Sequence, residues 1–283
     1  MDKSPDKFDP QERHAANDGL KESPGAGDRI LLLAGIAIIV ATLFLSPGGL
    51  LDKADHVGYA VCHQIPVRSY FFGDRQLPLC ARCSGQYLGA LFGLVSMIAM
   101  GRGRAGRMPP TPIVVILAGF IAIWAFDGLN SYLTLFPGAP HLYEPSNFLR
   151  VTTGGLQGVA LIALVWPFFN VSLWAKTSPR SSIGRLREVG LLLVVVALIV
   201  ALVNSEFAPL LYPLALLSVA GTLIMLTLVN TMIVVLVLKK DGAVRNWREA
   251  LPLVVAGLAL SSVGLLIIVL GRSWLTDMFG LPL

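Results

Sequence analysis

Long apolar runs alternate with short polar loops along most of this chain. Each run is close to the roughly 17–25 residues that a helix needs to cross the hydrocarbon layer of a membrane. The pattern therefore predicts an all-α fold, a polytopic transmembrane helical bundle with about seven spans. The expected spans cover residues 30–45, 80–100, 112–135, 148–169, 188–203, 209–238 and 249–270.

Lysine and arginine are distributed unevenly between the loops, and cytoplasmic loops carry an excess of both. The N-terminal segment and the loops after the second, fourth and sixth expected spans hold sixteen of these residues, whereas the other side holds six. This asymmetry predicts a cytoplasmic N-terminus and an extracytoplasmic C-terminus. The loop between the first two spans would then face the outside.

Composition supports a membrane protein and divides the chain into parts. Only 14% of the residues are charged, against about 25% in soluble domains. The net charge of +5 comes from loop residues that set topology, so we expect no nucleic-acid partner. Residues 1–28 lack an apolar period and are predicted to form a disordered cytoplasmic tail. A four-span core, residues 29–170, and a three-span C-terminal part, residues 171–283, would follow.

Glycines recur at four-residue spacing in two of the expected spans. The second span has Gly85, Gly89 and Gly93, and the fourth has Gly154 and Gly158. Small residues at this spacing let helix backbones approach closely in lipid. We therefore expect the second and fourth spans to pack against each other, which brings their outer ends together.

The three cysteines of the chain all lie between residues 62 and 83. Cys62 is followed by His63, and Cys80 and Cys83 form a CxxC pair. Tetrahedral zinc takes four ligands from Cys and His, commonly with one close Cys pair. The predicted metal ligands are therefore Cys62, His63, Cys80 and Cys83, with zinc or another divalent metal as the cofactor.

The neighbours Cys62 and His63 raise a geometric objection to this ligand set. Adjacent side chains of an extended segment point to opposite faces, so the two would chelate one ion only across a turn. Otherwise His56 or His141 supplies the fourth ligand, or the fourth position stays open, as it does in catalytic zinc sites.

Other uses of the cysteines stay open. A disulfide between Cys80 and either Cys83 or Cys62 would staple the outer loop in an oxidising compartment, and a cycling Cys80–Cys83 pair would perform thiol redox chemistry. Covalent haem requires CxxCH, whereas Ser84 follows this pair, and a four-cysteine iron–sulfur cluster lacks its fourth thiol. Arg82 would either favour thiolates or bind a lipid phosphate.

Asp127 lies in the outer half of the third expected span. An acidic residue within a span is a functional candidate by default. The fourth span opens with Arg150 at a similar depth, so Arg150 is its predicted partner. We treat both as candidate catalytic residues, Asp127 as a general base or ion ligand and Arg150 as the holder of an anionic group such as a lipid phosphate. The alternative is a structural ion pair that locks the two helices.

These residues belong to an ordered set of motifs. The set comprises Cys62-His63-Gln64, Arg68-Ser69, Leu77-Pro78-Leu79-Cys80-Ala81-Arg82-Cys83-Ser84-Gly85, Gly89, Asp127-Gly128 and Asn147-x-x-Arg150-x-x-Thr153-Gly154. It resembles the DUF2085 family of prokaryotic membrane proteins over about residues 56–160. The resemblance implies a shared fold, a shared site and a prokaryotic plasma membrane location. It implies no activity, because the family name records an unknown function.

Three functional hypotheses follow. The leading one is an integral membrane protein with an extracytoplasmic Cys/His metal site over a polar Asp/Arg pocket, which acts as a membrane-embedded metal-dependent enzyme if the metal keeps a water. The second is a transporter or a membrane-complex assembly subunit with a structural metal, and the third is a CxxC thiol redox protein. Membrane lipids are the expected partners, and the C-terminal spans could bind a membrane-protein partner.

Overall fold

The computed structural model describes residues 25–136, 138 and 140–279, so residues 1–24 of the predicted tail lie outside the described part. Within it the chain forms eight α-helices, two short 3-10 helices and four short strands. The helices are α2 (Ala26–Leu45), α3 (Leu50–Val61), α4 (Ala81–Ala99), α5 (Thr111–Leu133), α6 (Asn147–Leu173), α7 (Leu186–Asn204), α8 (Leu211–Val237) and α9 (Trp247–Phe279). The shorter elements are η1 (Pro66–Arg68), β1 (Phe71–Phe72), β2 (Arg75–Gln76), β3 (Ala105–Arg107), β4 (Ser178–Ser181) and η2 (Ala208–Leu210).

The predicted all-α membrane bundle is confirmed. Six of the described helices are long and apolar enough to cross a membrane, namely α2, α5, α6, α7, α8 together with η2, and α9. Many of their Leu, Ile, Val and Phe side chains are exposed, as lipid-facing surfaces require. Which side of the membrane each end faces stays a prediction.

The second predicted span forms α4, which is long enough at 19 residues but is less apolar than the six. Its place in the bundle explains the difference. It packs against α6, α7 and α8, and its residues Ala81 and Leu88 are completely enclosed. A helix surrounded by other helices can carry Arg82 and Gln86 without exposing them to lipid. That α4 also crosses the membrane stays a prediction.

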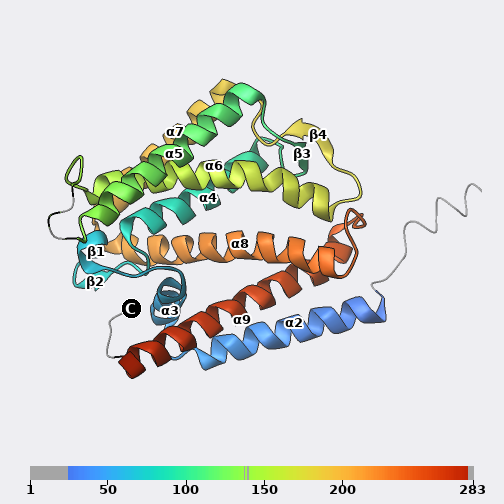
Figure 1. Ribbon diagram of the computed structural model, residues 1–283. Coiled ribbons are helices and arrows are strands. Elements are labelled where there is room, and N and C mark those ends of the chain that lie inside the picture. Colours follow the sequence, from blue (N-terminus) through green and yellow to red (C-terminus); the bar gives the residue numbers. More distant parts are fainter. Residues whose placement is uncertain (1–24, 137, 139, 280–283) are drawn as a thin grey trace, which may run out of the picture.

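The helices form a continuous series of neighbours (Figure 1). Helix α2 packs on α9, α9 on α8, α8 on α4, and α4 on α6, while α5 and α7 cover α6. In the most apolar part of α6, 61% of the residues are buried, compared with 6% in α2. The centre of the protein is therefore the α4–α6 pair.

Glycines set the close approach of α4 and α6, as the four-residue spacing predicted. A Cβ atom at Gly154 would overlap the carbonyl oxygen of Arg82, and one at Gly158 would overlap that of Gln86. Gly85 meets the backbone of α6 in the same way. The two helices run parallel, so their N-terminal ends lie together.

Short strands mark the two ends of the bundle (Figure 1). The β1–β2 hairpin and α3 lie at one end. At the opposite end β3 pairs in parallel with β4, and Trp174 bridges Val244. The loops that follow α4, α6 and α8 therefore meet at one end. These are three of the basic segments that predicted the cytoplasmic side.

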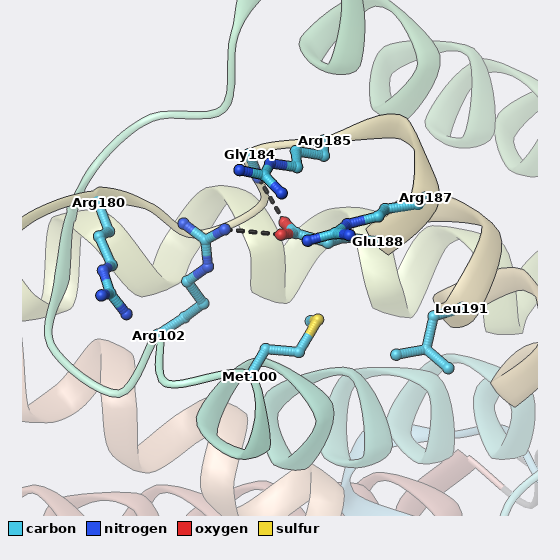
Figure 2. Close-up of a pocket in the computed structure, with 8 residues that line it drawn as sticks. All are labelled: Met100, Arg102, Arg180, Gly184, Arg185, Arg187, Glu188 and Leu191. Carbon is cyan, nitrogen blue, oxygen red and sulfur yellow. Dashed lines mark hydrogen bonds and ion pairs between the residues drawn. The ribbon is translucent and has the colours of Figure 1, made fainter.

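A cavity of about 750 Å³ opens at this basic end beside the start of α7. Figure 2 shows Arg102, from the loop after α4, directed at Glu188 of α7, with an Nη2–Oε1 distance of 2.7 Å. The N–H of Gly184 donates to the other carboxylate oxygen at 2.7 Å. Arg102 also donates to the carbonyl of Ser181 at 2.9 Å. These bonds fasten the loop after α4 to the start of α7.

Candidate metal centre and the adjoining arginine cavity

Three cysteine side chains converge where α3 ends and α4 begins. Cys62 directly follows α3, Cys80 directly precedes α4, and Cys83 lies in the first turn of α4. Their Sγ atoms all lie within 4.8 Å of one another. Cys62 is buried, and the other two are half-buried. The structure thus brings together the three thiols that the sequence singled out.

Gln64 holds the two cysteine-bearing segments against each other. Its backbone has a φ of 50°, a left-handed conformation that is uncommon for residues other than glycine. Its Nε2 atom donates to the carbonyl of Asp55 at 3.0 Å and to that of Pro78 at 2.8 Å. This clamp brings Cys62 to the N-terminus of α4, where the N–H of Cys80 donates to the Cys62 sulfur at 3.3 Å.

The electrostatics of the trio favour a thiolate at Cys62. Hydrogen bonds from the thiols of Cys80 and Cys83 lower the pKa of Cys62, and the backbone N–H of Cys80 acts in the same direction. The bond to Cys62 raises the pKa of Cys80. A low-pKa thiolate at a helix N-terminus is the chemical form that binds metals and reacts with electrophiles.

The candidate histidines are not grouped with the thiols. Cys62 has an extended backbone, with φ −139° and ψ 151°, so the side chain of His63 diverges from it, as the geometric objection foresaw. His63 is exposed and lines the cavity beside the thiols. His56 bonds to a backbone carbonyl at 2.7 Å, and His141 bonds to Glu144 at 2.9 Å.

Asp127 does not pair with Arg150, contrary to the prediction. Its carboxylate forms an ion pair with Arg82 of α4 and accepts hydrogen bonds from the Tyr143 hydroxyl at 2.7 Å and the Thr153 hydroxyl at 3.2 Å. Only 3% of its side chain is exposed. Both carboxylate oxygens accept hydrogen bonds. This arrangement fits a role of Asp127 in positioning its neighbours better than a role as a general base.

Burial of this network also affects the Tyr143 hydroxyl. Tyr143 lies in the loop between α5 and α6. Burial, together with its hydrogen bond to Asp127, raises the pKa of Tyr143 to about 12. The hydroxyl is therefore a neutral donor to Asp127 throughout the physiological range.

Arg150 lines the same hollow as the thiols. Its Nη1 atom donates to Asn147 Oδ1 at 2.8 Å, and its buried Nε atom has no hydrogen-bond partner. Arg68 lies nearby and donates to the carbonyl of Ser131 at 2.9 Å. A cavity of about 210 Å³ is lined by Val61, Cys62, His63, Gln64, Ile65, Arg68, Cys80, Arg82, Cys83 and Arg150. The thiols and three arginines thus face one hollow.

Sequence reasoning gave no role to two residues that support this site. The sequence identified Gln64 only as part of the Cys62-His63-Gln64 motif. A polar residue so close to Cys62 was the available indication that it could connect the two cysteine-bearing segments. Arg272 in α9 donates to the carbonyl of Cys62 at 2.9 Å, and its guanidinium lies over the Tyr59 ring at 4.0 Å. A charge late in the last apolar run was the available signal.

Comparison with known proteins places this site within a family. A family model described as "Predicted membrane protein (DUF2085)" matches residues 62–164. An uncharacterized protein of Methanothermobacter thermautotrophicus is 30% identical over 105 residues, which cover 37% of this chain and 83% of that protein. The chain belongs to the DUF2085 family. A second relative, the uncharacterized protein MJ1492 of Methanocaldococcus jannaschii, is 28% identical over 116 residues, which cover 41% of this chain and 68% of that protein. No solved structure matches.

The DUF2085 match begins at the first cysteine of the site. It extends through α4 and α5 and most of α6, so it contains Cys62, Cys80, Cys83, Asp127 and Arg150. The resemblance that the motifs indicated over residues 56–160 is confirmed, and helices α7–α9 lie outside the matched region. Both relatives are uncharacterized archaeal proteins, so the activity must be argued from the site.

Proposed function

We propose that this DUF2085 protein is an integral membrane metalloprotein that holds zinc, or another divalent metal, through Cys62, Cys80 and Cys83. The convergence of the three sulfur atoms within 4.8 Å carries the proposal. A tetrahedral zinc ion with Zn–S bonds of about 2.3 Å needs sulfur atoms about 3.8 Å apart. The thiols would therefore have to close by at most about 1 Å.

The fourth metal position favours an enzyme over a structural site. Structural zinc sites are closed by four protein ligands, whereas catalytic sites keep one position for water or substrate. Here three thiols line a hollow of about 210 Å³, and no histidine of the described part joins them within the same distance. A metal bound there would activate a water for hydrolysis.

The chain's own residues would divide the remaining tasks. The Asp127–Arg82 ion pair would fix the start of α4 against α5, and Arg150 would hold an anionic group in the cavity. His63, at the cavity wall, could approach the metal by a rotamer change. The site would face the outside of a prokaryotic plasma membrane, with lipids around the helices and the C-terminal spans free to contact a membrane-protein partner.

Elemental analysis of the purified protein tests the metal site. The full chain would be purified in detergent without added metal or chelator, and zinc and free thiols would be counted on one sample. We expect about one zinc per chain, which is lost in Cys62→Ser, Cys80→Ser and Cys83→Ser but retained in His63→Ala. Loss of zinc in His63→Ala would re-establish a closed Cys3His site and favour the structural role.

Two other outcomes would overturn the proposal. A metal-free protein with one free thiol contains a disulfide, which supports the thiol redox or loop-stapling alternatives. A metal-free protein with three free thiols means that the three cysteines did not retain zinc during expression and purification, which refutes the metal site. Mild reductant followed by thiol counting separates these two results.

A further inference from the structure

Two arginines beside the thiols, the buried Arg150 and the half-buried Arg68, have no acidic partner in the described part of the chain. Within the described part of the chain, the ion pairs include Arg82 with Asp127 but none that involves Arg68 or Arg150. Arg68 and Arg150 each donate one hydrogen bond, to a backbone carbonyl and to an amide oxygen. Most of their guanidinium donors are therefore left for another ligand.

The burial of these charges is costly without a counterion. Arg150 is 7% exposed, and its Nε atom is buried with no partner. Burial and the nearby Arg82 charge lower the pKa of Arg68. Removing one partner of a buried charge typically destabilises a protein strongly, because an uncompensated charge remains. An anion in the hollow that both side chains line would compensate these charges.

The thiols do not supply the missing negative charge. Three thiolates on one divalent ion leave a formal charge of minus one, whereas Arg68 and Arg150 together carry plus two. The Arg82–Asp127 pair is neutral as a unit. The cavity thus keeps an excess positive charge even when the metal site of the proposed function is occupied.

We propose that the cavity binds a phosphate-class oxyanion between Arg68 and Arg150, next to the metal. Guanidinium groups match the oxygen geometry of phosphate with two parallel hydrogen bonds. The volume of about 210 Å³ is below the roughly 300–1,000 Å³ of small-molecule pockets, so it suits a phosphoryl group rather than a whole organic ligand. The contact between the anion and the metal rests on the proposed metal site, whereas the contact with the arginines deepens the anion-holding role proposed for Arg150 and does not need the metal.

Either of two sources could present this group. Arg150 lies in the first turn of α6, at a helix end, where the phosphates of lipid headgroups also lie. The source is thus a lipid phosphate monoester in the membrane or a soluble phosphate. Both share the chemistry that the two arginines recognise, and the experiment below separates them.

Binding of inorganic phosphate to the full chain tests the proposal. Titration calorimetry at pH 7 would use zinc-loaded protein in a maltoside detergent, which contains no phosphate. We expect Arg68→Gln and Arg150→Gln each to weaken phosphate binding about ten- to hundredfold, the loss of one charge-assisted contact. Arg75→Gln is the matched control, because Arg75 lies at the same end but pairs with Asp52 and Asp55, and its affinity should stay unchanged.

The source is identified by competition in the same micelles. If added phosphatidic acid displaces the bound phosphate, the natural ligand is a lipid phosphate. If phosphatidic acid does not displace it, the natural ligand is a soluble phosphate. Both outcomes support the oxyanion site. Absent binding in the wild type, or equal binding in Arg68→Gln, overturns it. Arg68 is only half-buried, so that variant remains informative if Arg150→Gln does not fold.

Zinc measured on every sample keeps the two proposals apart. Arginine-dependent phosphate binding in a protein that never takes up zinc refutes the metal site and leaves the anion site standing. Zinc bound at one per chain, with no phosphate binding, refutes the anion site alone.

Discussion

Replacing Asp127 with Asn should destabilise the protein strongly. The substitution keeps the size of the side chain but removes the charge opposite Arg82 and places an amide among donors. Three donors, from Arg82, Tyr143 and Thr153, converge on the carboxylate. Asn offers one acceptor oxygen, so at least one buried donor loses its bond. Arg82 would also keep a charge that nothing nearby balances.

The burial of the pair sets the size of this loss. Breaking a buried ion pair by removing one partner typically costs about 3–5 kcal/mol. Asp127 is 3% exposed but Arg82 is 17% exposed, so water partly screens the charge that is left and the lower end, about 3 kcal/mol, applies. Asp55→Asn is the matched control at the same end of the bundle. Both side chains of its pair with Arg75 are 39% exposed, and such pairs contribute about 0–1 kcal/mol.

Equilibrium unfolding in mixed detergent micelles measures both variants on the same scale. The cycle is completed by Arg82→Gln and by the double variant, because the coupling energy isolates the pair from other effects of each change. The reasoning is refuted if Asp127→Asn loses no more stability than Asp55→Asn. If Asp127→Asn instead increases the stability of the protein, the charge of Asp127 is held at a cost to the fold, which is typical of active-site residues. The general-base hypothesis for Asp127 would then return.

Three further predictions concern packing, the basic end and the metal. Gly158→Ala should destabilise the protein by about 1–3 kcal/mol through overpacking, because the added methyl group overlaps the carbonyl oxygen of Gln86. Gly119→Ala is the control, because open space surrounds that position. Thermal unfolding should show the control variant to be as stable as the wild type or more stable. Glu188→Gln should release Arg102 and increase proteolysis of the loop after α4, measured by limited trypsin cleavage. Chelation under reducing conditions should lower the unfolding temperature and added zinc should restore it, because a ligand that binds only the native state stabilises it.

Much of the fold could be predicted because membrane spans have a simple signature. Apolar length located α5, α6 and α7 within a few residues, and the glycine spacing correctly paired α4 with α6. Helix α3 was not predicted. Its 12 residues are too few to span a membrane, and its polar residues resemble those of a loop. The end of α9 was also placed too early, because the prediction stopped before Arg272. In the structure Arg272 bonds to the backbone carbonyl of Cys62 and the helix continues past it.

The candidate site was only partly predictable, and the reason is geometric. Spacing identified Cys80 and Cys83 as a pair, because one helical turn places them together. Position along a helix predicts depth in the membrane, and on that ground Asp127 and Arg150 were expected at one level. The rotation of each helix about its axis does not follow from depth. That rotation pairs Asp127 with Arg82 and places Arg150 in the lining of the hollow that the thiols share.

Arg82 connects the two halves of the site through the start of α4. It lies between the paired cysteines in sequence, and its guanidinium binds the carboxylate and backbone of Asp127 in α5. The position of α4 is thus fixed from one side by this pair and from the other by the Gln64 clamp. Arg82 acts within the turn that carries Cys80 and Cys83, and Gln64 acts on Pro78, two residues before Cys80.

The C-terminal helices take part in this support although the family match does not include them. Arg272 of α9 holds the carbonyl of Cys62, and Asn204 at the end of α7 accepts a hydrogen bond of 2.8 Å from Tyr70, which follows the arginine-bearing η1. Each contact fixes the segment before α4 from outside the matched residues. These two contacts join α9 to the segment that carries Cys62 and α7 to the segment that follows η1. The support of the cysteine trio therefore extends beyond the matched residues into the C-terminal helices.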